Sequence, residues 1–211
     1  MILRLDLHVH TRCSQDAFTD PDMIAPIIRR RGLDGVALTE HDKCSSYRSE
    51  GILVVPGIEV SSRDGHIVAF GVHDAVPTGL SADQTIELLH DQNCVVVVPH
   101  PYDISSPSVD PLRLGSKVDG IETVNSSAIP FWLVKRRSEK AAKTLGVPMV
   151  AGSDSHIPST IGDAYTLIDV SSPSVESILE SIRSGRTTPC GSATSLGNRM
   201  LGLKMTLRKR I

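Results

Sequence analysis

Five short segments place histidine and carboxylate side chains directly after apolar runs of the sequence. They are Asp6-Leu7-His8-Val9-His10, Glu40-His41-Asp42, Gly57-Ile58-Glu59, Pro99-His100-Pro101 and Gly152-Ser153-Asp154-Ser155-His156. Imidazole and carboxylate ligands without a thiolate favour manganese, zinc or ferrous iron over a site for magnesium alone. Such ions lower the pKa of bound water and stabilise both oxygens of an in-line displacement. The segments therefore indicate metal-dependent hydrolysis.

Two of these segments carry their ligands at alternate positions. Side chains at positions i and i+2 of an extended chain share a face, so His8 and His10 point in one direction, as do Asp154 and His156. Any one of these histidines alone would more often be a structural residue. The five segments together predict one metal site.

The apolar runs before these segments predict β-strands. Strands are expected at residues 2–7, 34–39, 52–55, 66–72, 94–99, 120–124, 148–151 and 164–169, and helices between them, including 131–145 and 174–184. Nearly continuous apolar runs such as Val95–Val98 are typical of parallel strands buried on both faces. A capping box at Ser81 and Gln84 predicts the start of another helix.

Strands that alternate with helices allow either an open doubly wound sheet or a barrel. The candidate ligands follow six of the expected strands, and only a closed barrel brings so many strand ends onto one face. We therefore expect a small, irregular (β/α)-barrel over residues 1–185. Residues 186–211 are expected as a C-terminal segment that packs on the barrel or extends from it.

Charge is distributed unevenly along the 211 residues. Residues 186–211 carry six basic and no acidic side chains, whereas the remainder carries 16 basic and 24 acidic ones. We expect this basic segment to be a solvated terminus whose apolar residues pack on the barrel. The alternative is that it binds a phosphate or a polyanion.

The N-terminus lacks a signal-peptide pattern, and the apolar runs are too short to span a bilayer. A cytoplasmic protein without membrane contact is therefore expected.

The order and spacing of the motifs resemble the motif series of the PHP (polymerase and histidinol phosphatase) family of metal-dependent phosphoesterases. The similarity extends from residue 1 to about residue 170 and includes His8-x-His10-Thr11, Thr39-Glu40-His41-Asp42 and the three later segments. It implies a distorted seven-stranded TIM-like barrel that holds two or three divalent ions, Mn²⁺, Zn²⁺ or Fe²⁺.

The resemblance also implies a set of ligands. The first ion would be bound by His8, His10, Glu59 and Asp154, the second by Glu59 and His100, and the third by Asp16, His41 and His156. Asn125 stands where the family often has a further histidine for the second ion, and an amide oxygen is a weaker ligand than imidazole. The attacking water would be held by Glu59, Asp154 and His156.

Other side chains are candidates for the substrate and for ligand orientation. Three residues are candidates for the substrate phosphate. Arg63 and Lys43 are placed to bind its oxygens, with ordinary surface charges as the alternative. His66 is a candidate general acid or hydrogen-bond donor, with a buried structural role as the alternative. Asp6, Glu40 and Asp42 border ligand histidines and could orient their rings.

We expect hydrolysis of a small phosphate ester by a metal-bound hydroxide. One alternative is a nuclease or nucleotide-bisphosphate phosphatase that uses the basic segment. Another is a non-enzymatic scaffold subunit of a nucleic-acid-processing assembly.

Overall fold

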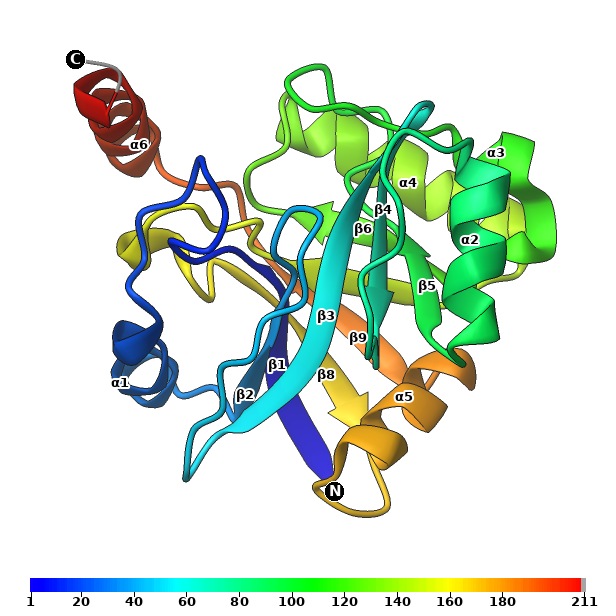
Figure 1. Ribbon diagram of the computed structural model, residues 1–211, viewed down its shortest axis with the longest axis horizontal. Helices are drawn as coiled ribbons and strands as arrows, with labels where there is room; N and C mark the ends of the chain where they lie inside the picture. Colours follow the sequence, from blue (N-terminus) through cyan, green and yellow to red (C-terminus); the bar gives the residue numbers. More distant parts are fainter. Residues whose placement is uncertain (210–211) are drawn as a thin grey trace.

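A nine-stranded sheet forms the centre of the computed structural model, which describes residues 1–209 (Figure 1). The strand order is β7-β6-β5-β4-β3-β2-β1-β8-β9. The strands are β1 (Ile2–Val9), β2 (Gly35–Leu38), β3 (Leu53–Ser62), β4 (Gly65–Phe70), β5 (Val95–Val98), β6 (Gly120–Asn125), β7 (Met149–Gly152), β8 (Ala164–Asp169) and β9 (Thr187–Gly191).

Helices surround this sheet. They are α1 (Ile24–Arg30), α2 (Ala82–Asp91), α3 (Pro111–Leu114), α4 (Phe131–Leu145), α5 (Val175–Arg183) and α6 (Leu196–Lys209). The predicted capping box is confirmed, because the Ser81 side chain accepts the Gln84 N–H and the Gln84 side chain accepts the Ser81 N–H. The predicted helix 131–145 is also confirmed, and it ends at Gly146, whose φ of 67° suits a glycine.

The sheet is nearly closed, as expected, but its strand directions are mixed. Strands β1 to β3 and β5 to β7 pair in parallel, whereas β3 with β4, β4 with β5 and β1 with β8 pair antiparallel. A bridge between Val9 and Ser155 joins the end of β1 to the segment after β7 and brings the two sides of the sheet together.

The largest difference from the sequence prediction lies in β3. We expected a strand that ends at residue 55, with Glu59 beyond it, but β3 continues to Ser62 and contains Glu59. The connection to β4 is only Arg63 and Asp64, and so short a turn can join only antiparallel strands. The nearly parallel sheet that the apolar runs suggested is therefore wrong at this hairpin.

Strand β1 separates the apolar core from the polar site. Leu5 and Leu7 belong to a buried cluster that includes Phe70 and Ile178 of α5. The alternation of a strand directs His8 to the opposite face. The same strand therefore contributes to the core and to the candidate site.

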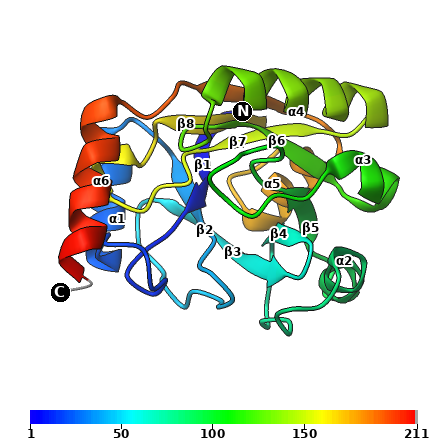
Figure 2. The same cartoon turned by 90° about the horizontal axis from the view of Figure 1, so that it is seen from above.

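The C-terminal segment divides into two parts. Residues 187–191 form β9, which pairs with β8, so the sheet continues past residue 185. Helix α6 then lies at the edge of the molecule in both views (Figures 1 and 2). The segment from residue 186 to 211 has six basic residues, and one of them, Arg210, lies outside the described residues. None of the helices among residues 1–209 has the length and hydrophobicity that a membrane span requires.

Candidate metal centre

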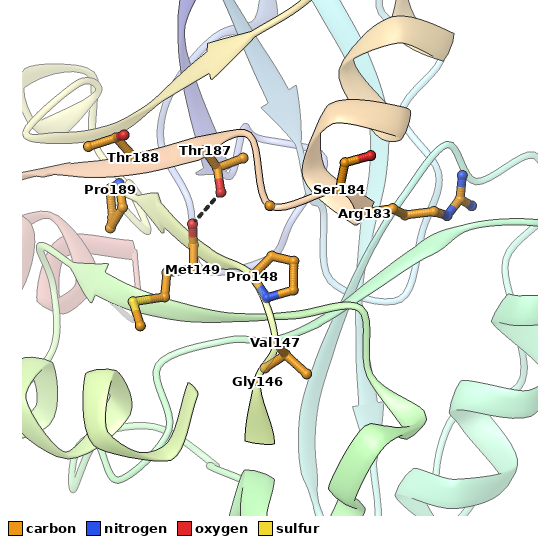
Figure 3. Close-up of a pocket in the computed structure, with 10 residues that line it drawn as sticks. Gly146, Val147, Pro148, Met149, Arg183, Ser184, Thr187, Thr188 and Pro189 are labelled. Atoms are coloured by element: carbon orange, nitrogen blue, oxygen red, sulfur yellow. Dashed lines mark hydrogen bonds between the residues drawn. The ribbon is translucent and has the colours of Figure 1, made fainter. Parts of the chain in front are cut away.

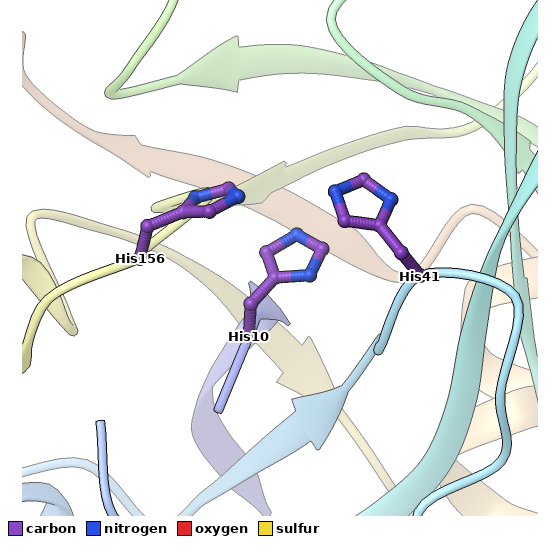
Figure 4. Close-up of side chains that lie close together, drawn as sticks. All are labelled: His10, His41 and His156. Carbon is purple, nitrogen blue, oxygen red and sulfur yellow. The ribbon is translucent and has the colours of Figure 1, made fainter. Parts of the chain in front are cut away.

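The ligand-bearing segments meet where the sheet closes. Isolated β-bridges pair Val9 with Ser155 and His41 with Glu59. The main chains of these segments therefore lie side by side at, or next to, the candidate ligands. Figure 4 shows His10, His41 and His156, which come from three separate segments, with their rings facing a common centre. One potential ligand atom from each of these histidines lies within 4.8 Å of those of the other two.

Glu59 is the centre of the cluster, and its two oxygen atoms contact different histidines. Oε2 lies 3.3 Å from His8 Nε2, 3.2 Å from His10 Nε2 and 3.4 Å from His41 Nδ1. Oε1 lies 3.0 Å from His66 Nδ1 and 3.0 Å from His100 Nε2. The carboxylate therefore stands between two groups of imidazoles.

Two aspartates complete the cluster. Asp154 Oδ1 lies 3.7 Å from His8 Nε2, 3.4 Å from His10 Nε2 and 3.6 Å from His156 Nδ1. Asp16 Oδ2 lies 3.2 Å from His156 Nε2 and 3.4 Å from His41 Nε2. The predicted ligands other than Asn125 therefore form three adjoining groups. The first surrounds Asp154 and Glu59 Oε2, the second surrounds Glu59 Oε1, and the third surrounds Asp16.

Three buried imidazole nitrogens of the cluster lack a hydrogen-bond partner within residues 1–209, and two of them face Glu59 oxygens. His10 Nε2, His66 Nδ1 and His100 Nδ1 are buried and have no hydrogen-bond partner among the described residues. His10 Nε2 and His66 Nδ1 nevertheless lie close to Glu59 oxygens. Buried nitrogens of this kind require an explanation, and a shared cation supplies one. The mixture of imidazole and carboxylate donors fits a divalent transition-metal ion.

The carboxylates change the protonation of the buried histidines. Burial lowers the pKa of His8, but Glu122, Glu59 and Asp154 outweigh it and raise this pKa well above its ordinary value. Burial also lowers the pKa of His156, but the hydrogen bond to Asp16 and the nearby carboxylates raise it to about 9. Burial raises the pKa of Glu59, but His8 and the other histidines hold it well below its usual range. A cation that binds here therefore replaces protons.

Glu122 in β6 belongs to the candidate site, although it was not predicted from the sequence. Its Oε1 lies 3.0 Å from His8 Nδ1, and its Oε2 accepts the His100 N–H at 2.8 Å. A carboxylate on the second ring nitrogen fixes the orientation of a metal-binding histidine. The available signal was a glutamate inside the apolar strand Gly120–Asn125, where a charged side chain needs a partner.

Asn125 lies beside the cluster but directs its amide oxygen away from it. Its Oδ1 accepts the Ala128 N–H at 3.0 Å, and its Nδ2 donates to Glu122 Oε2 at 2.8 Å and to Asp154 Oδ2 at 3.3 Å. A ligand role for Asn125 stays a prediction, and this orientation does not support it. The amide is arranged to hold Asp154.

The three candidate phosphate-binding residues lie in different places. His66 lies inside the cluster, with its ring against Glu59. Lys43 lines a cavity of about 470 Å³ together with Asp16, His41 and His66. Arg63 lies in the β3–β4 turn and is not among the residues that line this cavity.

The three carboxylates predicted to orient the rings of ligand histidines accept their hydrogen bonds from main-chain N–H groups and hydroxyls, and none of these bonds comes from an imidazole. Glu40 accepts hydrogen bonds from Thr11 Oγ1 and from Ser14 Oγ, which in turn lies 3.4 Å from His10 Nδ1. Asp6 accepts the Ser153 N–H at 2.8 Å, and Asp42 accepts the Ser61 N–H at 2.7 Å. These bonds connect the ligand-bearing loops to one another.

A second cavity, of about 430 Å³, has no such chemistry. It is lined by the ends of α4 and α5 and by parts of β7 and β9, including Pro148, Met149 and Thr187 (Figure 3). Among its lining residues are neither histidines nor carboxylates. The candidate functional site is therefore the histidine and carboxylate cluster.

Comparison with known proteins supports the family resemblance. Residues 133–187 match the sequence family described as PHP-associated. An uncharacterised protein of Methanocaldococcus jannaschii is 26% identical over 59% of this chain and 82% of its own length. A probable phosphatase of Caldicellulosiruptor bescii is 26% identical over 77% of this chain and 83% of its own length.

The fold is also similar to that of a crystal structure from Bacteroides vulgatus, a two-domain protein containing a predicted PHP-like metal-dependent phosphoesterase. The two structures superpose with a TM-score of 0.71 at 20% identity, over 91% of this chain. The chain spans 65% of the length of that protein. The sequence match over residues 133–187, the nearly closed sheet and the clustered histidines and carboxylates all agree with a similarity to the PHP family of metal-dependent phosphoesterases.

Proposed function

We propose that the protein is a metal-dependent phosphoesterase that hydrolyses a small phosphate ester. The observation that carries this proposal is Glu59, whose two carboxylate oxygens contact two separate groups of imidazoles. A carboxylate in this position is arranged to bridge two cations. The phosphatase and phosphoesterase descriptions of the relatives agree with this chemistry.

Divalent ions bound at such a site lower the pKa of water and stabilise charge on phosphoryl oxygens. The chain's own residues hold and orient these ions. In this proposal His8, His10, Glu59 and Asp154 hold the first ion, and Asp16, His41 and His156 hold the third. Lys43 supplies positive charge for a phosphate group in the adjoining cavity.

For the second ion we propose that His66 supplies the imidazole missing at Asn125. His66 Nδ1 and His100 Nε2 lie at equal distances of 3.0 Å from Glu59 Oε1. The amide oxygen of Asn125, by contrast, accepts a hydrogen bond from Ala128. This ligand set replaces the role of general acid or hydrogen-bond donor to the substrate that the sequence suggested for His66.

The test combines metal analysis with an activity assay on a generic ester such as p-nitrophenyl phosphate. In Mn²⁺, His8→Ala and Asp154→Ala are expected to abolish turnover, whereas His66→Gln is expected to lose one equivalent of metal. His90→Gln is the matched control, because His90 is a surface histidine paired with Asp119. Full activity in both alanine variants would refute the proposal. A wild-type protein that binds no metal and has no activity would favour the scaffold function instead.

A second candidate substrate is a nucleotide bisphosphate or a short oligonucleotide. Arg12, Lys43 and Lys209 line a cavity of about 690 Å³ that also contains Asp16 of the third ligand group. Lys209 belongs to α6 and lies 5.1 Å from the centre of the Phe18 ring. The basic C-terminal segment therefore reaches the edge of the site, where further phosphate groups would meet positive charge.

Salt dependence distinguishes this candidate from a small ester. If Lys209 contacts a substrate phosphate, Lys209→Ala should reduce the slope of log affinity for an oligonucleotide against log salt by about one. Lys204→Ala, on the exposed part of the same helix, is the control. Equal slopes in the two variants would exclude an anchoring role for Lys209.

A further inference from the structure

Arg199 in α6 binds a turn of the main chain rather than a carboxylate. Its Nη1 donates to the carbonyl of Ser127 at 2.8 Å, and its Nη2 donates to those of Ser126 at 3.0 Å and Ala128 at 3.4 Å. Its Nε donates to the Thr194 carbonyl at 3.1 Å. Four carbonyls thus share one guanidinium.

The turn that Arg199 holds lies directly after β6 and supports Asp154. Ser127 Oγ donates to the Asp154 carbonyl at 3.2 Å. The Ala128 N–H donates to Asn125 Oδ1, which leaves Asn125 Nδ2 directed at Asp154 Oδ2, 3.3 Å away. The turn therefore contacts both the main chain and the carboxylate of this candidate ligand.

Asp154 needs such support because its backbone is in an unfavourable conformation. Its φ is 52°, in the left-handed region that residues other than glycine adopt uncommonly, although aspartate does so more often than most. A residue of this kind keeps its conformation only when surrounding contacts determine it. The Asp154 N–H is bound to the His8 carbonyl at 2.8 Å. The Asp154 carbonyl is held by Ser127 Oγ and by His156 Nδ1, and the turn after β6 adds the Asn125 amide at the carboxylate.

Only an arginine can hold the turn in this way. The planar guanidinium presents donors in a fixed fork, whereas a lysine ammonium is a single point charge on a flexible stem. Four of the five N–H groups of Arg199 are used by carbonyls. Although Arg199 lines a cavity with Asp154 and His156, it has little capacity left to bind a substrate phosphate.

We propose that Arg199 is a positioning residue, which fixes the turn after β6 and through it the carboxylate of Asp154 at the metal centre. The role rests on the proposed function, because it takes Asp154 as an ion ligand. It assigns α6 a task in the chemistry even though none of the residues of this helix is buried.

The test measures Mn²⁺ affinity by calorimetry in the full chain, together with the melting temperature Tm. Arg199→Ala is expected to bind Mn²⁺ roughly 10- to 100-fold more weakly, as is typical when a partner of a metal ligand is lost. Arg199→Lys should recover little of this loss. Arg208→Ala, an exposed arginine of the same helix, should bind as the wild type does. Added guanidinium ion, below denaturing concentrations, should restore part of the affinity of Arg199→Ala.

Three results would overturn the proposal. The first is an Mn²⁺ affinity of Arg199→Ala equal to that of the wild type. The second is unfolding of both Arg199 variants while Arg208→Ala stays folded, because Arg199 would then serve stability alone. The third is a wild-type protein that binds no ion. Affinity is measured without substrate, so a protein that binds Mn²⁺ and hydrolyses no ester would refute the proposed function, while the affinity comparison still decides the role of Arg199.

Discussion

At Gly152, β7 lies close against His8 and Glu122 of the candidate metal centre, and Gly152→Ala is a direct test of this geometry. A methyl group on this residue would lie 2.3 Å from His8 Cβ, 2.7 Å from His8 N and 2.8 Å from Glu122 Oε1. Carbon atoms pack comfortably at about 3.5–4.0 Å. Strand β1 or β7 would therefore have to move by roughly 1 Å to accept the alanine.

This movement should affect both stability and ligand geometry. Overpacking of a buried position costs about 1–3 kcal/mol, and we expect the upper end because the contacts are with main-chain and Cβ atoms. For a domain of this size, 3 kcal/mol corresponds to a decrease in Tm of roughly 6–12 °C. The 3.0 Å contact between His8 and Glu122 lies at the added methyl group, so metal affinity should fall as well. A displacement of 1 Å can cost about 100-fold in activity.

Thermal melts and Mn²⁺ titrations of Gly152→Ala measure the two effects. The matched control is Gly120→Ala in β6, where the added methyl would lie 3.2 Å from the Pro148 carbonyl oxygen and 3.5 Å from Val97 Cγ2. These contacts need a shift of only a few tenths of an ångström, so the control should melt close to the wild type and bind metal normally. If Gly152→Ala behaved like Gly120→Ala, the described contact between β7 and His8 would be incorrect.

Two further predictions concern the metal centre. Glu122→Gln removes the charge that faces His8 Nδ1, so metal affinity measured by calorimetry should fall about 10- to 100-fold. Glu87→Gln, on the exposed face of α2, is the control and should leave this affinity unchanged. Equal affinities in the two variants would show that Glu122 does not orient His8. Mn²⁺ or Zn²⁺ at about 100 times its Kd should add about 2.7 kcal/mol to the free energy of unfolding. The Tm should then rise by roughly 5–11 °C and return to its starting value with a chelator, and a Tm that does not respond to these ions would contradict a preformed site.

The sequence alone was sufficient for features that depend on neighbouring residues. The helix 131–145 and its end at Gly146 follow from periodicity and from the left-handed conformation that glycine adopts easily. The common face of His8 and His10 follows from the alternation of an extended strand. These signals act over a few residues, so no knowledge of distant contacts was needed.

Features that depend on distant contacts could not be predicted in the same way. Glu59 was predicted as a ligand from its position after an apolar run, but its place inside β3 depends on the hairpin with β4. This hairpin also brings His66 to Glu59. Glu122 has no motif around it, and its partners His8 and His100 are 114 and 22 residues away in sequence.

Helix α6 is the clearest case of this limit. Its composition predicted only a basic terminal segment, yet Arg199 reaches a turn more than 70 residues earlier and Lys209 reaches the loop of Asp16. The type of each residue and the pattern of its neighbours indicate which side chains can bind a metal, which residues cap helices and which segments form strands. The closure of the sheet decides which of these side chains come into contact. This closure depends on many long-range contacts, which no short segment of the sequence encodes.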